Sequence, residues 1–88
     1  SSDLCPYCAN ARRAVAELIE ADPAYGEIPL EWYEETERPD VASGYSYEYV
    51  PNFFVRNEKV YEARPGESYG ETKFYIKKVF DTILKEGQ

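Results

Sequence analysis

The chain has 88 residues, of which 43% are hydrophobic, and this size suits one small domain, spanning residues 1–88, with a single core. Its 17 acidic and 10 basic residues give a net charge of -7, which argues against binding to nucleic acid or to an anionic membrane surface. The apolar runs are a few residues long, so no segment of the sequence is expected to span a bilayer.

The first predicted element is a helix that begins at Pro6, because proline is favoured at the first helical position. Its apolar residues recur at the spacing of one helix face: Ala11, Val15, Leu18 and Ile19. This start places Cys5 at the N-cap and Cys8 in the first turn. Arg12 and Arg13 fall mostly off the apolar face, so we expect both to be solvated.

A turn over residues 22–26, which contains proline and glycine, ends this helix. Alternating apolar residues then predict a strand over residues 28–33, and Pro29 within the run makes it an edge strand. We expect Trp32 of this strand to pack into the core. A short helix of one to two turns, carrying residues 41–42, should follow.

Two strands, residues 52–56 and 59–63, flank a tight turn at Asn57-Glu58 and predict a hairpin. Ser68, with Glu71 three residues later, forms a capping box that begins the last helix. The apolar stripe of that helix and the glycine that stops it are Ile76, Val79, Phe80, Ile83, Leu84 and Gly87.

Cys5 and Cys8 are the only cysteines in the chain, and three kinds of site use such a pair. A structural metal site wants four Cys or His ligands, but the chain has no histidine, so we expect no metal. An inert disulfide is the second alternative, and a redox pair, which the CxxC spacing favours, is the third. At a helix start, free N–H groups and the helix dipole lower the pKa of a thiol. Cys5 is therefore the predicted nucleophile and Cys8 the resolving thiol.

CPYC at residues 5–8 resembles the active site of glutaredoxins. Val50-Pro51, at the start of a hairpin strand, resembles the cis-proline signature that glutaredoxins and thioredoxins share. Further residues stand at the spacing that thioredoxins show in the same region: Pro39, Ala42, Tyr45 and Gly66. The likeness covers nearly the whole chain. It implies an α/β, thioredoxin-like fold, in which helices flank a mixed central sheet.

The resemblance also implies roles for individual residues. Cys5 would attack a substrate disulfide and Cys8 would resolve the product, with Pro6 supporting the start of the helix. Pro51 would lie in cis beside the sulfurs, and Val50 would offer its backbone N–H and C=O to an extended substrate. The implied substrate-binding residues are Tyr7, Tyr49, Val50 and Pro51.

The chain departs from glutaredoxins at Ser2, where they usually have lysine, and over residues 64–69, which lack their Gly-Gly-x-Asp segment. We therefore expect no tightly bound cofactor. The implied partners are disulfide-containing proteins, with glutathione or thioredoxin reductase as the electron source. A cytoplasmic monomer that binds neither nucleic acid nor membrane is expected.

The strand before the active-site helix lies in the middle of the sheet in this fold, between a parallel strand and the hairpin. Only four residues precede Cys5 here. We expect roughly ten further upstream residues in the natural protein to supply that strand. Otherwise another chain must fill the gap or the sheet must rearrange, because unpaired backbone groups are costly.

Three functional hypotheses remain open. The first is a thiol–disulfide oxidoreductase that reduces protein or small-molecule disulfides. The second is a non-catalytic binding module with a thioredoxin fold. The third is a glutaredoxin-like dimer that binds glutathione or an iron–sulfur cluster.

Overall fold

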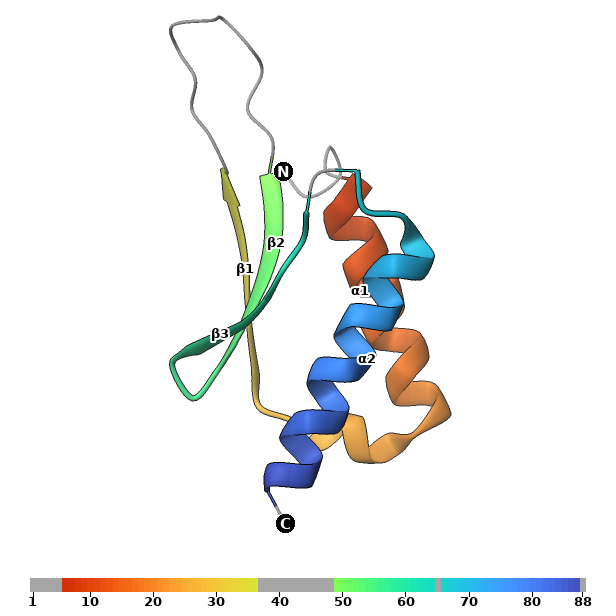
Figure 1. The fold of residues 1–88 in the computed structure, drawn as a ribbon, viewed down its shortest axis with the longest axis vertical. Helices are drawn as coiled ribbons and strands as arrows, with labels where there is room; N and C mark the ends of the chain where they lie inside the picture. The colour runs from red at the N-terminus through yellow and green to blue at the C-terminus, as the bar shows by residue number, and fades with distance from the viewer. Residues whose placement is uncertain (1–5, 37–48, 65, 88) are drawn as a thin grey trace, which may run out of the picture.

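The computed structural model describes residues 6–36, 49–64 and 66–87 (Figure 1). The elements in chain order are α1 (Pro6–Ala21), the 3₁₀ helix η2 (Pro23–Glu27), β1 (Leu30–Thr36), β2 (Tyr49–Val55), β3 (Glu58–Glu62) and α2 (Tyr69–Glu86). The predicted short helix that carries residues 41–42 lies outside the described residues. The chain is thus a small α/β protein, which confirms the predicted α/β class.

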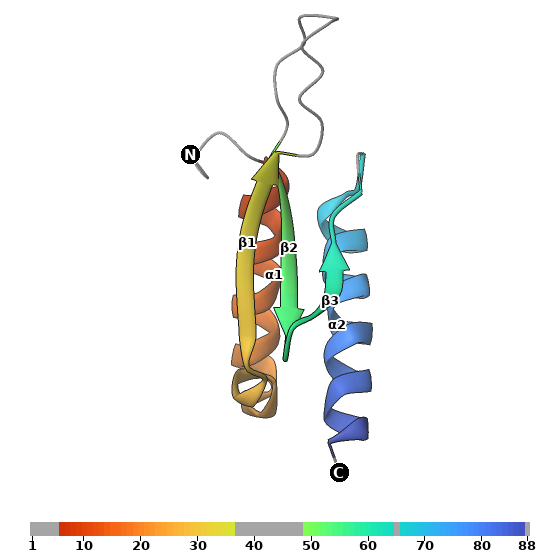
Figure 2. The same cartoon turned by 90° about the vertical axis from the view of Figure 1, so that its left-hand side faces the viewer.

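The strands form one antiparallel sheet in the order β1-β2-β3, and both helices cover the same face of it (Figure 2). β1 pairs with β2 along its whole length, from Leu30 opposite Val55 to Thr36 opposite Tyr49. The predicted mixed sheet has a further strand between these two, whereas the described sheet is entirely antiparallel. Direct pairing of β1 with β2 gives partners to backbone N–H and C=O groups that would otherwise lack them.

α1 packs its predicted apolar face inward. The fully or nearly buried residues on this face are Cys8, Ala11, Ala14 and Leu18, with Val15 and Ile19 partly buried. Arg12 and Arg13 are exposed, but each guanidinium lies over an aromatic ring. The guanidinium carbon of Arg12 is 5.2 Å from the ring centroid of Trp32, and that of Arg13 is 4.1 Å from the centroid of Tyr69. Both arginines therefore make cation–π contacts in addition to facing solvent.

The turn predicted over residues 22–26 is the short helix η2. The carboxylate of Asp22 caps it by accepting the backbone N–H of Ala24 at 3.1 Å. β1 then begins at Leu30, directly after Pro29 and two residues after the predicted start. As predicted, this strand lies at an edge of the sheet, which suits the missing N–H of the proline beside it.

β2 and β3 form the predicted hairpin, but its turn lies one residue earlier than predicted. Arg56 and Asn57 have φ values of 51° and 70°, and Val55 is the register partner of Glu58. Two successive residues with positive φ are the geometry of a type I′ turn. The predicted turn at Asn57-Glu58 is therefore wrong by one position. Asparagine is favourable at either central position, so its presence alone does not fix the register.

α2 begins with the predicted capping box. The Ser68 hydroxyl accepts the backbone N–H of Glu71 at 3.1 Å, and the Glu71 carboxylate accepts the backbone N–H of Ser68 at 2.8 Å. Gly87 ends the helix and donates its N–H to the carbonyl of Ile83 at 2.9 Å. The predicted apolar stripe faces the core, with Ile76 and Phe80 fully buried and Val79, Ile83 and Leu84 partly buried.

An aromatic layer fills the space between the sheet and the helices. The ring of Phe53 is fully buried, and its centroid lies 4.5 Å from that of Trp32 and 5.2 Å from that of Tyr61. Tyr25 of η2 packs against Phe80 of α2, with 5.5 Å between the ring centroids. The prediction that Trp32 packs against the core is confirmed. Such aromatic pairs add stability beyond the apolar area that they bury.

Candidate functional site

The candidate site lies at the N-terminal end of α1. Pro6 is the first residue of this helix, as predicted. The backbone N–H groups in the first turn of a helix have no partner within it, and they carry the positive end of the helix dipole. Cys5 stands directly before Pro6 in the sequence and lies outside the described residues, as does its predicted N-cap role.

Cys8 is the third residue of α1, and its side chain is completely buried. Its sulfur takes part in a disulfide bond, so it carries no titratable proton in this state. It shares the inner face of the helix with Ala11 and Ala14. The position under the first turn is the one predicted for Cys8.

Tyr7 stands between the two cysteines in the sequence and is half-buried. Its hydroxyl accepts a hydrogen bond from the backbone N–H of Gly66 at 2.7 Å. Gly66 has a φ of 82°, which residues with a side chain rarely adopt. The segment before α2 therefore turns back onto the first turn of α1. The Tyr7 ring packs against the core cluster, and its hydroxyl is held by Gly66. The expected role of Tyr7 in lining a substrate groove stays a prediction.

Pro51 and Val50 belong to β2, the middle strand of the sheet. Pro51 is fully buried, pairs in register with Glu34, and accepts the backbone N–H of Ala63 on its carbonyl at 3.1 Å. The described residues contain no cis peptide bond, so the predicted cis bond before Pro51 is wrong. A trans bond keeps the chain extended, and the pairing with β1 continues through Val50. Tyr49 and Val50 stand at the start of β2, where they pair in register with Thr36 and Glu35 of β1. Contacts of Tyr49 and of the Val50 backbone with an extended substrate stay a prediction.

Three segments meet at one end of the molecule: the start of α1, the start of β2 and the connection from β3 to α2 (Figure 1). The hydrogen bond between Tyr7 and Gly66 joins the first segment to the third, and α1 also packs against β2. The first turn of α1, which carries Cys8, and the start of β2, which carries Pro51, therefore lie at the same end of the molecule.

Glu67 is a buried residue of this end that the sequence analysis missed. Its side chain is only 1% exposed, and its carboxylate accepts hydrogen bonds from the hydroxyls of Tyr61 and Thr72. It also accepts the backbone N–H of Arg64 at 3.3 Å, and the Arg64 guanidinium lies 3.7 Å away. Burial, and then the bond to Glu67, raise the pKa of Tyr61. Because these partners come from β3 and α2, no local pattern around Glu67 announces its burial.

Glu17 joins α1 to α2. It accepts hydrogen bonds from the hydroxyl of Tyr69, from the ammonium of Lys73 at 3.1 Å and from the guanidinium of Arg13 at 3.2 Å. The bonds from Tyr69, Lys73 and Arg13 lower the pKa of Glu17 to about 2. Burial and the bond to Glu17 raise the pKa of Tyr69. The helix that carries the candidate site is therefore held to α2 by charged groups as well as by apolar packing.

Residues 6–36, 49–64 and 66–87 show neither a metal cluster nor a membrane-spanning helix. No group of three or more His, Cys, Asp or Glu side chains in these ranges is placed to hold a metal ion. Neither helix in them combines the length and the apolar character that crossing a bilayer requires.

Comparisons with protein-family models, with curated proteins and with solved structures give no match to this chain.

Proposed function

We propose that this chain is a thiol–disulfide oxidoreductase that uses Cys5 and Cys8 as its redox-active pair. The observation that carries the proposal is the position of Cys8, which is buried and disulfide-bonded in the first turn of the helix that begins at Pro6. Cys5 stands three residues before Cys8, at the sequence position where a helix start lowers the pKa of a thiol most. This spacing supports a redox pair over an inert link.

The proposed reaction uses the two cysteines in turn. In the reduced protein, the thiolate of Cys5 attacks one sulfur of a substrate disulfide, and the other substrate sulfur leaves as a thiolate that takes up a proton. The thiol of Cys8 then loses its proton and attacks the sulfur of Cys5, which releases the remaining substrate thiolate. The substrate disulfide is reduced to two thiols, and the Cys5–Cys8 dithiol is oxidised to a disulfide.

An external electron donor must then reduce the protein again, and glutathione and thioredoxin reductase are the two proposed donors. The proposed substrates are disulfide-containing proteins or small mixed disulfides. The start of β2 lies at the same end of the molecule as the start of α1, which supports contacts of Tyr49 and Val50 with an extended substrate (Figure 1). No tightly bound cofactor is needed for this chemistry.

A side-by-side assay tests the proposal. The protein is assayed for insulin reduction with thioredoxin reductase and for reduction of a small mixed disulfide with glutathione, and the faster reaction identifies the donor. Cys5→Ser should abolish both activities, whereas Cys8→Ser should accumulate mixed disulfides that electrophoresis without reductant detects. The rate of Cys5 alkylation against pH should give a pKa below about 8.5, the ordinary value for a free cysteine.

The same experiments identify the alternatives. An ordinary pKa for Cys5, with no activity from either donor, would assign the chain to the non-catalytic binding modules. Visible absorbance after anaerobic reconstitution with iron and sulfide would favour an iron–sulfur dimer instead. Because Pro6 and Tyr7 separate the cysteines as in glutaredoxins, we expect a reduction potential of about -200 to -230 mV. A measured potential below about -260 mV would contradict that expectation.

A further inference from the structure

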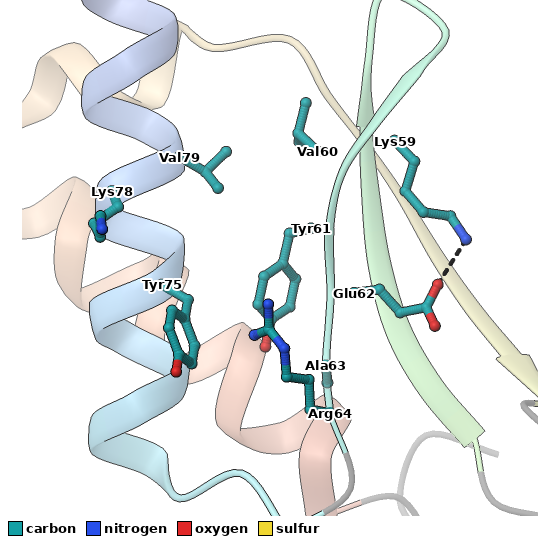
Figure 3. A pocket seen from close by; sticks show the side chains of 9 residues that line it. All are labelled: Lys59, Val60, Tyr61, Glu62, Ala63, Arg64, Tyr75, Lys78 and Val79. Atoms are coloured by element: carbon teal, nitrogen blue, oxygen red, sulfur yellow. Dashed lines mark hydrogen bonds and ion pairs between the residues drawn. The ribbon is translucent and has the colours of Figure 1, made fainter.

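A groove runs between β3 and α2. It consists of two adjoining cavities of about 690 and 580 Å³ that share Lys59, Val60, Lys78 and Val79 in their lining. Figure 3 shows Val79 of α2 across from Val60 of β3. The ring of Tyr75, also on α2, closes one end, where the Arg64 guanidinium carbon lies 4.6 Å from its centroid.

The groove borders an open edge of the sheet. One edge of β3 pairs with β2, from Asn52 opposite Glu62 to Val55 opposite Glu58. The other edge has no neighbouring strand in the part of the chain that the structure describes. An edge of this kind presents a row of backbone N–H and C=O groups, and an extended peptide can pair with them.

The floor of the groove is apolar and only half-covered. Its apolar side chains are Val60, Tyr75, Val79 and Ile83, all of which are partly buried and packed against the core cluster. Side chains of a strand alternate between two sides. Every second residue of a strand added to β3 would therefore reach this floor.

The charge of the groove is opposite to that of the rest of the chain. Its lining holds four of the 10 basic residues but only three of the 17 acidic ones. The basic members are Arg56, Lys59, Arg64 and Lys78. Lys59 is ion-paired with Glu62 at 2.7 Å on the side of β3 away from α2 (Figure 3), and Arg64 lies 3.7 Å from the buried Glu67. The Arg64 side chain is 65% exposed and so can still reach a ligand. In a chain with a net charge of -7, a lining with one more basic than acidic residue repels a negatively charged ligand less than the rest of the surface does.

We propose that this groove binds an extended, acidic segment of a partner protein, which pairs as a fourth strand with the open edge of β3. Apolar side chains of the segment lie on the floor, and its carboxylates reach Lys78 and Arg64. β3 has five residues, so the paired part of the segment spans about 16 Å at roughly 3.3 Å per residue. The proposal does not depend on the thiol chemistry of Cys5 and Cys8.

Other occupants fit the groove less well. A second copy of this chain would bring another net charge of -7, and repulsion between the copies opposes that contact. β1 of one copy could also pair with β3 of the next, head to tail. Such an assembly would leave one unpaired sheet edge at each of its ends, so it would not form a closed oligomer. A nucleic acid meets the same repulsion over most of the surface.

An NMR titration of the isotope-labelled protein tests the proposal with a synthetic peptide of about seven alternating valine and glutamate residues. The expected result is saturable binding, with shifts confined to β3 and to the neighbouring residues Tyr75, Val79 and Ile83. The same peptide with lysine in place of glutamate should not saturate. Equal binding of the two peptides, or shifts elsewhere on the protein, would overturn the proposal.

Charge reversals at two positions of α2 distinguish binding in the groove from a general effect of the net charge of the chain. Lys78→Glu should weaken binding of the glutamate peptide about fivefold, because the variant loses an exposed ion pair and adds repulsion between carboxylates. Lys85→Glu makes the same change on the same helix, but Lys85 does not line the groove. The affinity of the Lys85→Glu variant for the glutamate peptide should stay unchanged. An equal loss of affinity in both variants would contradict binding in the groove.

A modified peptide tests the strand pairing without changing the protein. Methylation of the backbone nitrogens on one edge of the glutamate peptide removes the donors that face β3, so binding should be lost. Full affinity for that peptide would exclude a fourth strand. If the protein alone forms dimers with the same NMR shifts, a second copy of the chain occupies the groove. That result would refute the proposed partner.

Discussion

Tyr7 connects two segments that lie 59 residues apart in the chain. Its ring packs against the core, and its hydroxyl holds the backbone of Gly66, whose positive φ aims the N–H group at the first turn of α1. The side chain between the two cysteines therefore fixes the turn that carries them. This contact gives Tyr7 a structural role in addition to its predicted role in substrate binding.

Tyr7→Phe should remove this hydrogen bond and leave the ring in place. A typical hydrogen bond contributes about 0.5–1.5 kcal/mol, so the free energy of unfolding should fall by about 1 kcal/mol. The amide of Gly66 should also exchange with solvent faster, because it loses its acceptor. Urea denaturation and hydrogen exchange followed by NMR measure the two effects.

Tyr33→Phe is the matched control, since the side chain of Tyr33 is 47% exposed on β1. Its free energy of unfolding should change by less than about 0.5 kcal/mol. If the two variants lose equal stability, or if the Gly66 amide is unaffected in Tyr7→Phe, the hydroxyl does not hold the turn.

Single residues also show where prediction from the sequence stops. The helix start at Pro6 and the capping box of Ser68 depend on neighbours in the chain, and both were predictable. The burial of Glu67 depends on hydroxyl groups from two other elements, so no local pattern indicates it. The cis bond before Pro51 was inferred from resemblance alone, and pairing with β1 keeps the backbone extended there.

At the scale of elements, α2 was the most predictable part of the fold. Its apolar stripe repeats at the helical spacing, and its start and end carry their own signals. The hairpin was predicted too, but its turn was placed one residue late, because Asn57 suits both central positions. Strand starts depend on pairing with a neighbouring strand, which local sequence does not specify.

The contact between α1 and α2 should depend on pH through Glu17. In the folded protein its pKa is lowered from 4.5 to about 2, by hydrogen bonds from Tyr69, Lys73 and Arg13. A carboxyl whose pKa is depressed on folding stabilises the protein above its unfolded pKa. That contribution should be lost as the pH falls from about 4.5 toward 2. Glu17→Gln should therefore be less stable than the parent at neutral pH, and the two should converge in acid.

Urea denaturation at several pH values, followed by the fluorescence of Trp32, measures this difference. Glu20→Gln is the control, because Glu20 is an exposed carboxylate on the same helix. Its stability should remain parallel to that of the parent across the acid range. A constant gap between Glu17→Gln and the parent at every pH would show that the carboxylate contributes no pH-dependent link.

At the scale of the whole molecule, we expect the aromatic layer around Phe53 to contribute a large part of the stability. Native proteins are stable by about 0.05–0.15 kcal/mol per residue, which for a chain of this size is about 4–13 kcal/mol in total. Replacing a buried phenylalanine by alanine costs about 3–5 kcal/mol. One such change therefore removes a large part of the total.

Phe53→Ala should lower the free energy of unfolding by about 3–5 kcal/mol, because this ring is fully buried between Trp32 and Tyr61. Phe74→Ala makes the same change at a ring that is 58% exposed on α2, and it should cost far less. Thermal unfolding followed by circular dichroism compares the two. Similar losses would mean that the layer around Phe53 is not the centre of the core.

The arrangement of the sheet shows the limit of prediction at this scale. The α/β class follows from the order of the elements along the chain. Which strands become neighbours does not, because it depends on the backbone partners available to each strand. In the described residues β1 takes the place beside β2 that the thioredoxin-like arrangement reserves for another strand.

The bond between Glu17 and Tyr69 spans 52 positions of the chain, and this separation affects how the protein is made. Ribosomes add about 5–20 residues per second, so Tyr69 is synthesised roughly 3 to 10 s after Glu17. A helix as short as α1 is marginal by itself in water. During those seconds its apolar face has no α2 to cover it, and the nascent chain is then most open to chaperones and to association with other unfinished chains.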